Sequence, residues 1–281
     1  MSFTTLIQPA DLMGHLDDPR YLVVDCRFDL ADQGAGEAAW RKGRIPGAAY
    51  LHLDRDLSGP VSATTGRHPL PDPASFAATL GFLGVTPATQ VVAYDAGPGF
   101  FAARLWWMLR WVGHDAAAVL DGGLAAWTSA GGPVDRSVRQ RGHAAFEPRL
   151  RDGLALSASA LQQALAAGRL VLLDARAAER FAGRVEPIDP VAGHVPGALN
   201  HPCSTNVGPD GRFLPPQELA RRYAATLEGH GGDPIACMCG SGVTACHDIL
   251  ALEIAGLAGA RLYPGSWSEW IRDPSRPVAR G

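Results

Sequence analysis

The chain contains one sequence pattern twice, and this internal repeat constrains the fold more than any other feature. Four segments of the first half recur in the same order in the second half: 23–27 in 172–176, 43–48 in 193–198, 96–99 in 239–242, and 122–127 in 265–270. A repeat that preserves both motifs and their order indicates duplication of a whole structural unit. We therefore predict two domains, 1–138 and 139–281, in a chain of 281 residues.

The segment at about 131–153 is the predicted linker between the two copies. It opens with Gly-Gly-Pro, carries five arginines and lacks apolar periodicity. Glycine and proline interrupt regular structure, and a run of charges is usually a solvated surface. We expect an exposed tether.

Each copy alternates short apolar runs with helical patterns. The strands expected from β-branched runs are 21–25 and 90–94 in the first copy, and 170–174 and 234–238 in the second. Helices are expected at 157–167, with Ser157 as the N-cap, and at 216–227. Strands separated by helices favour an α/β fold with a mainly parallel sheet flanked by helices. Ligands of such sheets bind at the carboxyl ends of the strands.

Cys239 directly follows one of these strands and precedes a helical pattern that starts near Ala245. Between them lie Gly240 and Gly242, which let the chain turn tightly around the sulfur. Converging backbone N–H groups and a helix N-terminus both favour an anion there. Both effects favour the thiolate, which is the nucleophilic form of cysteine. The first copy has Ala96 at the aligned position, so we expect one active and one silent copy.

Composition excludes several classes of protein. The net charge is −3, and a nucleic-acid-binding chain would normally carry a basic excess. The chain has five cysteines, and such a sparse set with an odd number does not fit a disulfide framework. The most apolar stretch, 99–113, is interrupted by two arginines and is too short to cross a membrane. No signal peptide is visible at the N-terminus. We expect a cytoplasmic protein with free thiols and no nucleic-acid or membrane partner.

These motifs resemble those of the two-domain sulfurtransferases of the rhodanese family. The resemblance rests on Cys-Gly-Ser-Gly-Val-Thr at 239–244, on Gly-x-[Ile/Val]-Pro-Gly-Ala at 43–48 and 193–198, and on Tyr-Pro-Gly-Ser-Trp-Ser-Glu-Trp at 263–270. It covers nearly the whole chain and is closest to the 3-mercaptopyruvate sulfurtransferase branch. It implies two tandem rhodanese-like domains with the site in the cleft between them.

The resemblance also implies a reaction. Cys239 would take a sulfur atom from a small-molecule donor, become a persulfide, and pass the sulfur to cyanide or to a thiol such as thioredoxin. No metal or organic cofactor is implied. Ser241 would form a catalytic triad with Asp56 and His68 of the first domain. The substrate-binding residues would be Arg180 together with the loop residues Gly240, Gly242, Val243 and Thr244.

One departure concerns the donor. The family often has a second arginine after Glu-Pro, but here Glu186-Pro187 is followed by Ile188-Asp189, and Arg184 is the nearest substitute. Gly240 and Ser241 bring no cation for thiosulfate, whose leaving group is sulfite, so mercaptopyruvate is the expected donor. Thiosulfate:cyanide sulfur transfer remains the first alternative.

Three other classes of function stay open. A non-catalytic sulfur carrier or interaction module is possible because the first copy already lacks the cysteine. A phosphatase would need an arginine six residues after Cys239, where Ala245 stands. Cys237, Cys239, Cys246 and His247 fit a zinc site poorly, because zinc pairs are usually spaced by two to four residues. Cys237 could also be a redox partner of Cys239, although a buried structural cysteine is favoured.

Overall fold

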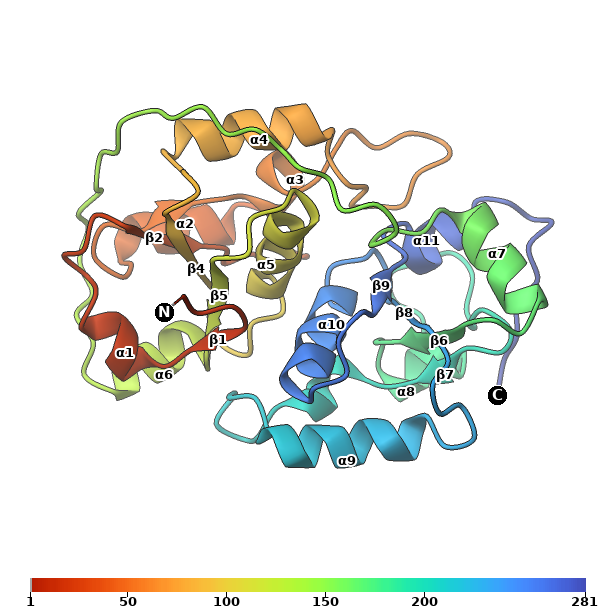
Figure 1. Ribbon diagram of the computed structural model, residues 1–281. Coiled ribbons are helices and arrows are strands. Elements are labelled where there is room, and N and C mark those ends of the chain that lie inside the picture. The colour runs from red at the N-terminus through yellow and green to blue at the C-terminus, as the bar shows by residue number, and fades with distance from the viewer. Residues whose placement is uncertain (1) are drawn as a thin grey trace. The chain divides into compact units, whose positions relative to one another are not determined.

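The computed structural model describes residues 2–281, which form two compact units (Figure 1). The first unit comprises the chain up to Gly59, Leu70–Arg151 and Gly208–Phe213. The second comprises Pro60–Pro69, Asp152–Val207 and Leu214–Gly281. Two short segments, Pro60–Pro69 and Gly208–Phe213, therefore belong to a different unit from the residues on either side of them in the sequence. The predicted boundary at residues 138 and 139 lies inside the linker and stays a prediction.

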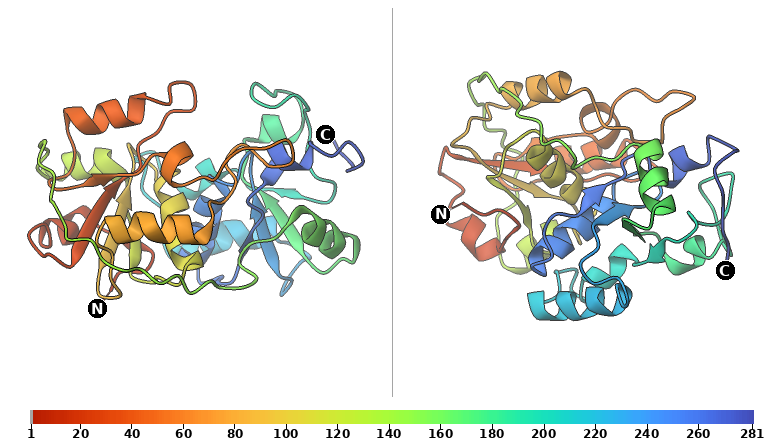
Figure 2. Two further views of the ribbon diagram at one scale, coloured as in Figure 1. Left: turned by 90° about the horizontal axis from the view of Figure 1, so that it is seen from above. Right: turned by 45° about the vertical axis from the view of Figure 1, so that its right-hand side comes forward.

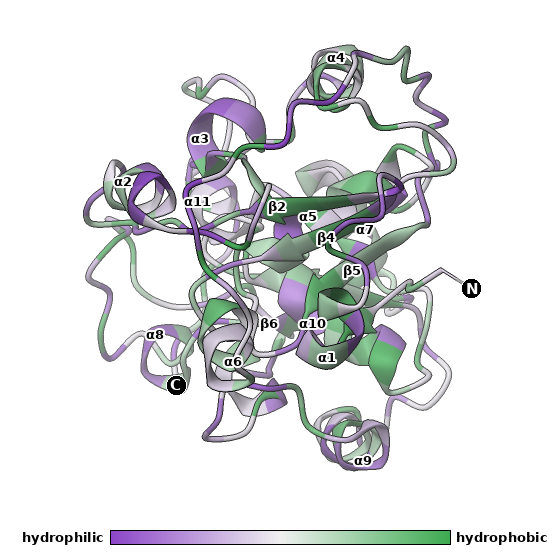
Figure 3. Ribbon diagram, turned by 90° about the vertical axis from the view of Figure 1, so that its left-hand side faces the viewer, coloured by the Kyte–Doolittle hydropathy of each residue, from purple (hydrophilic) through white to green (hydrophobic). Residues whose placement is uncertain are grey.

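The first unit contains a five-stranded parallel sheet in the order β1-β5-β4-β2-β3. Its strands are β1 (Leu6–Ile7), β2 (Tyr21–Asp25), β3 (Ala49–Tyr50), β4 (Gln90–Tyr94) and β5 (Ala117–Leu120). β2, β4 and β5 are buried along nearly their whole length, and they are coloured as hydrophobic in Figure 3. A parallel sheet covered on both faces needs such continuous apolar runs rather than alternation.

Helices cover this sheet (Figure 2). They are α1 (Pro9–Met13), α2 (Ala35–Lys42), α3 (Leu53–Asp56), α4 (Pro73–Phe82), α5 (Ala102–Trp111) and α6 (Gly123–Ser129). α5 packs against β4 and β5, and its Trp106 and Trp107 are fully buried. Trp111 stacks on Trp107 with ring centroids 6.0 Å apart. Trp106 and Trp107 are thus part of the core, and Trp111 is half-buried at the end of the helix.

The linker is not a free tether. Arg139 donates to the carbonyl of Leu16, and Arg141 donates to the carbonyl of Tyr21. Arg151 pairs with Asp115 at 2.5 Å. Most of residues 131–150 are exposed, as expected, but these side chains also hold the segment against the first unit through contacts that the sequence pattern does not reveal.

The second unit contains a four-stranded parallel sheet in the order β7-β6-β8-β9. Its strands are β6 (Val171–Asp174), β7 (Leu199–Asn200), β8 (Ile235–Met238) and β9 (Arg261–Leu262). Its helices are α7 (Ala158–Ala166), α8 (Ala178–Phe181), the 3₁₀ helix η1 (Cys203–Asn206), α9 (Pro216–Thr226), α10 (Ala245–Ile254) and α11 (Ser266–Trp270). One core cluster joins α7, β6, β8 and α11 through residues such as Leu161, Leu172, Met238 and Trp267.

The secondary-structure predictions are confirmed to within a residue at each end. β2 and β4 span the predicted residues, and β6 and β8 each begin one residue later than expected. Ser157 caps α7 by accepting the Ala160 N–H at 3.2 Å. The α/β class with two parallel sheets is also confirmed.

The register of the second sheet positions the candidate site. Asp174, at the end of β6, pairs with Met238, at the end of β8. The loops that follow these two strands, one beginning at Ala175 and the other at Cys239, therefore leave the sheet at the same edge. None of the helices formed by residues 2–281 combines the length and the hydrophobicity that crossing a bilayer requires.

Candidate functional site

Cys239 lies in a tight loop between β8 and α10. Its side chain is almost completely buried, and its Sγ accepts the Gly242 N–H at 3.2 Å. Gly242 has φ +77°, and a Cβ at that position would lie 2.2 Å from the Pro264 carbonyl oxygen. Only glycine fits there, because it alone adopts a positive φ freely and leaves room for Pro264. The loop therefore directs a backbone N–H at the sulfur, as the sequence predicts.

Ser266 supports the backbone beneath the sulfur. Its Oγ accepts the Cys239 N–H at 3.0 Å and donates to the Tyr263 carbonyl at 2.9 Å. Ser266 has φ +53°, and it is the one non-glycine residue with a positive φ among residues 2–281. Such backbone strain persists only where the surroundings enforce it, and it often occurs at functional sites.

Ser241 and His68 meet next to this loop. The Ser241 Oγ and the His68 Nδ1 are 2.7 Å apart, and both side chains are buried. The segment that carries His68 is held by the Arg67 N–H, which donates to the Ser268 Oγ at 3.1 Å. By its contacts, His68 groups with the second unit, because the Pro60–Pro69 segment does so. Its place in the first domain of the sequence stays a prediction.

Two arginines approach the loop at Gly240. A Cβ on Gly240 would lie 2.9 Å from Arg67 Nη2 and 3.7 Å from Arg180 Nη1. Arg180 forms a bond of 2.7 Å to Glu186 Oε1 and one of 3.2 Å to Asp189 Oδ2. Arg67 pairs with the other oxygen of Asp189. The predicted substrate arginine, Arg180, is thus beside the nucleophile.

The two carboxylates under these arginines respond differently to burial. Burial raises the pKa of Asp189, although the guanidinium of Arg67 opposes that effect. Burial also acts to raise the pKa of Glu186, but the Arg180 hydrogen bond and two backbone N–H groups outweigh it and hold this pKa below its usual value. Glu186 is therefore the firmer anionic anchor for Arg180.

Two of the other predicted site residues, Arg184 and Asp56, are bonded to neighbours within their own units. Arg184 is exposed and pairs with Glu179 at 2.7 Å. Asp56 belongs to the first unit, where its Oδ2 accepts the His52 N–H at 2.7 Å. The role of Asp56 in a triad stays a prediction. Val243 is buried and Thr244 half-buried in the loop itself.

In the first copy, the loop that follows β4 holds a carboxylate where the second copy has Cys239. Because Asp25 pairs with Tyr94 as Asp174 pairs with Met238, the counterpart of Cys239 is Asp95 and not Ala96. The loop of the first copy is one residue longer, which explains the misalignment. Asp95 is buried; its Oδ1 accepts the N–H groups of Gly97 and Gly99 at 3.0 Å, and its Oδ2 accepts those of Phe101 and Ala102. Burial raises the pKa of Asp95, and these four bonds oppose it.

The remaining cysteines are buried, and none of them forms a disulfide. Burial raises the pKa values of Cys26, Cys203 and Cys237 well above the usual value for a thiol. Cys246 donates its S–H to the Gly242 carbonyl at 3.4 Å. Among residues 2–281, no three side chains of His, Cys, Asp or Glu come together as a metal site would require.

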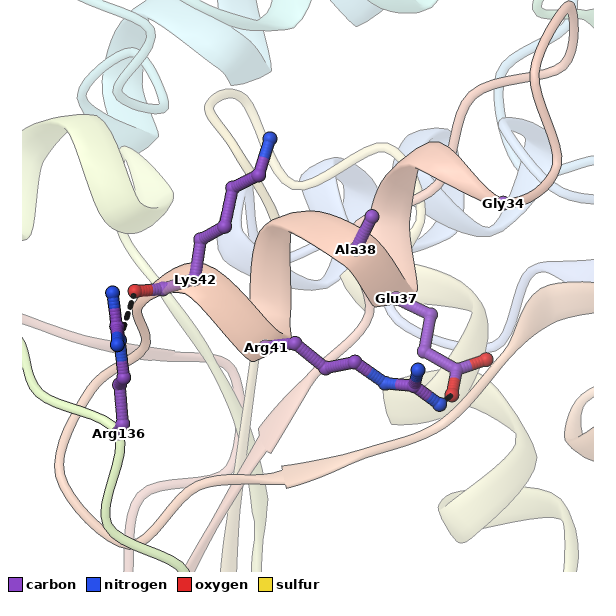
Figure 4. A pocket seen from close by; sticks show the side chains of 6 residues that line it. All are labelled: Gly34, Glu37, Ala38, Arg41, Lys42 and Arg136. Atoms are coloured by element: carbon purple, nitrogen blue, oxygen red, sulfur yellow. Dashed lines mark hydrogen bonds and ion pairs between the residues drawn. The ribbon is translucent and has the colours of Figure 1, made fainter.

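A surface hollow of the first unit lies on α2 (Figure 4). It is lined by Gly34, Glu37, Ala38, Arg41, Lys42 and Arg136. Glu37 is already paired with Arg41 at 2.5 Å, and Arg136 donates to the Lys42 carbonyl. The hollow is thus lined by one carboxylate and three cationic side chains, and none of its lining residues is a cysteine, serine or histidine.

Comparison with known proteins places this fold and this loop in a family. The rhodanese-like domain family matches residues 8–130 and again residues 157–273. A probable 3-mercaptopyruvate sulfurtransferase of Pseudomonas aeruginosa is 50% identical over the whole of both chains. A putative thiosulfate sulfurtransferase, SseB, of Mycobacterium tuberculosis is 43% identical over 98% of this chain and 97% of its own. The chain belongs to the rhodanese family.

A solved structure agrees. The 3-mercaptopyruvate sulfurtransferase SseA of Escherichia coli matches with a TM-score of 0.81 and 32% identity, over 95% of this chain and all of its own. The predicted fold, two rhodanese-like domains, is confirmed. The chain is an enzyme of the sulfurtransferase class, as the resemblance implied.

Sequence reasoning missed three residues of this site. Arg67 adjoined the predicted His68 but had no signal of its own, because its partner Asp189 is 122 positions away. The sequence marks Asp189 only as a departure from the family pattern. Ser266 lies in a recognised motif, and its aligned counterpart Gly123 has nearly the same φ, +56°. A glycine aligned with a serine was the one available signal for that unusual backbone.

Proposed function

We propose that this sulfurtransferase takes its sulfur from 3-mercaptopyruvate through a persulfide on Cys239. The observation that carries the proposal is the arrangement around one sulfur atom. A backbone N–H points at Sγ, a serine–histidine pair adjoins it, and guanidinium groups lie beside the next residue of the loop. A nucleophile, a proton relay and a carboxylate clamp are the three parts that this donor requires.

The first half-reaction breaks a carbon–sulfur bond. The thiolate of Cys239 attacks the mercapto sulfur of the donor and forms an S–S bond. The electron pair of the broken bond passes to the methylene carbon of the departing group, which is the enolate of pyruvate. A proton delivered through Ser241 and His68 converts the enolate into pyruvate. The Gly242 N–H, which points at the sulfur, stabilises the charge on the persulfide that remains.

The second half-reaction restores the enzyme. The thiolate of an acceptor attacks the outer sulfur and forms a new persulfide, and the S–S bond to Cys239 breaks with its electron pair returning to Sγ. Cyanide accepts the same sulfur to give thiocyanate. A small thiol or thioredoxin is the proposed natural acceptor. Five cysteines that form no disulfide support a reducing, cytoplasmic setting.

Thiosulfate is the second candidate donor. The two arginines beside Gly240 supply cations that the loop sequence itself lacks, and the relative from Mycobacterium tuberculosis is named for this donor. A dianionic donor whose leaving group is sulfite would benefit from both guanidinium groups. The first candidate is preferred because Ser241 and His68 offer a proton relay that an enolate needs and sulfite does not.

The test is a comparison of kcat/KM for the two donors on one enzyme preparation. We expect mercaptopyruvate to be favoured by at least about tenfold, which corresponds to ~1.4 kcal/mol of transition-state stabilisation. Cys239→Ser should abolish turnover of both donors and the gain of one sulfur atom seen by mass spectrometry. Cys237→Ser, at a buried strand position, is the matched control and should retain persulfide formation. A ratio that favours thiosulfate would reverse the donor assignment.

A further inference from the structure

The segment from Val185 to Asp189 has its charged side chains inside and its apolar side chains outside. The side chains of Glu186 and Asp189 are 3% and 4% exposed, because both pair with arginines. Val185 and Ile188 are 52% and 47% exposed. Folded proteins normally show the opposite arrangement, with carboxylates in water and aliphatic side chains inside. The sulfur-transfer chemistry itself does not require two aliphatic side chains to face solvent here.

Hydrogen bonds fix the backbone of this segment. The N–H groups of Ile188 and Asp189 both donate to Glu186 Oε1 at 3.1 Å. The Val185 N–H donates to the Glu179 carbonyl, at the start of α8, at 3.2 Å. The segment is thus tied both to its own carboxylate and to the neighbouring helix. A partner that binds the two apolar side chains would therefore lose little backbone entropy in ordering them.

The segment also lies close to the nucleophile. Its buried carboxylates hold Arg180, whose Nη1 lies 3.7 Å from the Cβ position of Gly240. Gly240 follows Cys239, which is only 2% exposed. A small donor held by guanidinium groups gains nothing from apolar side chains beyond them. A protein that brings a thiol to a buried sulfur, however, has to place its own surface against the residues around that sulfur.

We infer that Val185 and Ile188 form the centre of a docking surface for a protein that carries the acceptor thiol. The partner has its reactive thiol in an apolar part of its own surface, because aliphatic side chains gain most from burial against apolar groups. The exposed ion pair of Arg184 with Glu179 borders Val185 and supplies the charged rim that is typical of protein interfaces. The inference rests on the proposed function only in that Cys239 carries the sulfur; it does not depend on the donor.

The test compares a protein thiol with small acceptors in the second half-reaction. Cys239 is loaded from mercaptopyruvate, and its loss of sulfur to reduced thioredoxin, dithiothreitol or cyanide is followed in a single turnover by mass spectrometry. The double variant Val185→Thr, Ile188→Thr keeps β-branched side chains and puts a hydroxyl in place of an alkyl branch. Its rate constant with thioredoxin should fall by about tenfold, because the apolar contact is lost. The rate constants with dithiothreitol and cyanide, and KM for mercaptopyruvate, should change by less than about twofold.

Leu257→Thr is the matched control. Leu257 is 37% exposed and follows the C-terminal end of α10, whose other end adjoins the Cys239 loop. The ten residues of this helix, at about 1.5 Å each, separate Leu257 from the loop by about 15 Å. This variant should transfer sulfur to all three acceptors at the rates of the parent. A slower transfer to thioredoxin in the control as well would overturn the assignment of the surface to residues 185 and 188.

Three results would overturn the inference directly. The double variant could transfer sulfur to thioredoxin as fast as the parent does. Its transfer to the small acceptors could fall by the same factor, which would indicate a disturbed site rather than a lost contact. The parent could also transfer sulfur to thioredoxin no faster than to dithiothreitol at equal thiol concentration. Should the double variant fail to fold by circular dichroism, the two single variants decide, with an expected loss of about threefold each.

The loading step separates this inference from the proposed function. If mercaptopyruvate fails to load Cys239 but inorganic polysulfide does, the donor assignment is wrong, and the transfer comparison still decides the docking surface. If mercaptopyruvate loads the enzyme and the double variant matches the parent with every acceptor, the donor assignment stands and the docking surface is refuted. An enzyme that neither donor loads would refute both.

Discussion

Substituting Ser266 separates the strain in this residue from the hydrogen bonds that it makes. Its hydroxyl joins the Cys239 N–H to the Tyr263 carbonyl, and its φ of +53° is unfavourable for any residue with a Cβ. Ser266→Ala removes the hydroxyl and keeps the strain. Ser266→Gly removes the hydroxyl and relieves the strain. The two variants therefore lose the same bonds and differ in the backbone cost.

The size of each effect follows from the structure. Both variants leave the buried N–H of Cys239 without its acceptor, which costs ~1–3 kcal/mol. A left-handed conformation costs ~1–2 kcal/mol for a residue with a Cβ. We expect Ser266→Ala to lower the free energy of unfolding by about 2 kcal/mol, and Ser266→Gly to be more stable than Ser266→Ala by about 1 kcal/mol.

Urea unfolding measures the stability, and hydrogen exchange measures the local effect. The Cys239 amide should lose protection in both variants, and kcat should fall in both by about tenfold or more because the nucleophile is less firmly positioned. If Ser266→Ala and Ser266→Gly were equally stable, the strain argument would be wrong. If the Cys239 amide kept its protection in both, the supporting role of the hydroxyl would be refuted.

Two further predictions concern buried groups of the second unit. Burial raises the pKa of Asp248 well above its usual value, so the stability linked to its proton is present below about pH 4 and is lost as the pH rises. The amide oxygen of an Asp248→Asn variant can still accept the hydrogen bond from Asn206. In urea titrations, this variant should have a higher free energy of unfolding at alkaline pH, and that free energy should vary less with pH than in the parent. An unchanged pH dependence would contradict this. His68→Ala should lower kcat with mercaptopyruvate by about 100-fold and change KM little, because it removes the partner of Ser241 in the proton relay; a kcat close to that of the parent would exclude that relay.

The elements of the fold follow from local patterns. The strand Tyr21–Asp25 is β-branched, short and bounded by polar residues, and such runs form strands wherever both faces are covered. The Cys239 loop is equally local, because the turn around the sulfur depends on glycines within three residues of it. For these features, the residues that are in contact in the structure are also close together in the sequence.

Features that depend on distant contacts could not be predicted in this way. Arg67 reaches Asp189 across 122 positions, and His68 reaches Ser241 across 173. Neither pair leaves a periodic signal in the sequence. Serine at a positive φ is equally hidden, because serine ordinarily avoids that conformation and its local sequence looks like a helix start.

The counterpart of Cys239 in the first copy is Asp95, and not Ala96 as the sequence alignment predicts. The two loops can therefore be compared atom by atom. The glycine with positive φ donates to the group at the end of the strand in both copies: Gly99 to Asp95 Oδ1 at 3.0 Å, and Gly242 to Cys239 Sγ at 3.2 Å. The fold thus provides an anion-binding nest twice, and the copies differ in what fills it.

A carboxylate reaches across its nest with two oxygens, and Asp95 uses both of them to accept four N–H groups. A cysteine thiolate has one such atom, and the Gly242 N–H donates to it. A persulfide adds a second atom to the side chain, as many bonds from the backbone as a carboxylate oxygen. Loading the sulfur therefore supplies the atom that the carboxylate provides permanently. This explains why one copy is inert and well satisfied, whereas the other favours the charged, sulfur-loaded state on which transfer depends.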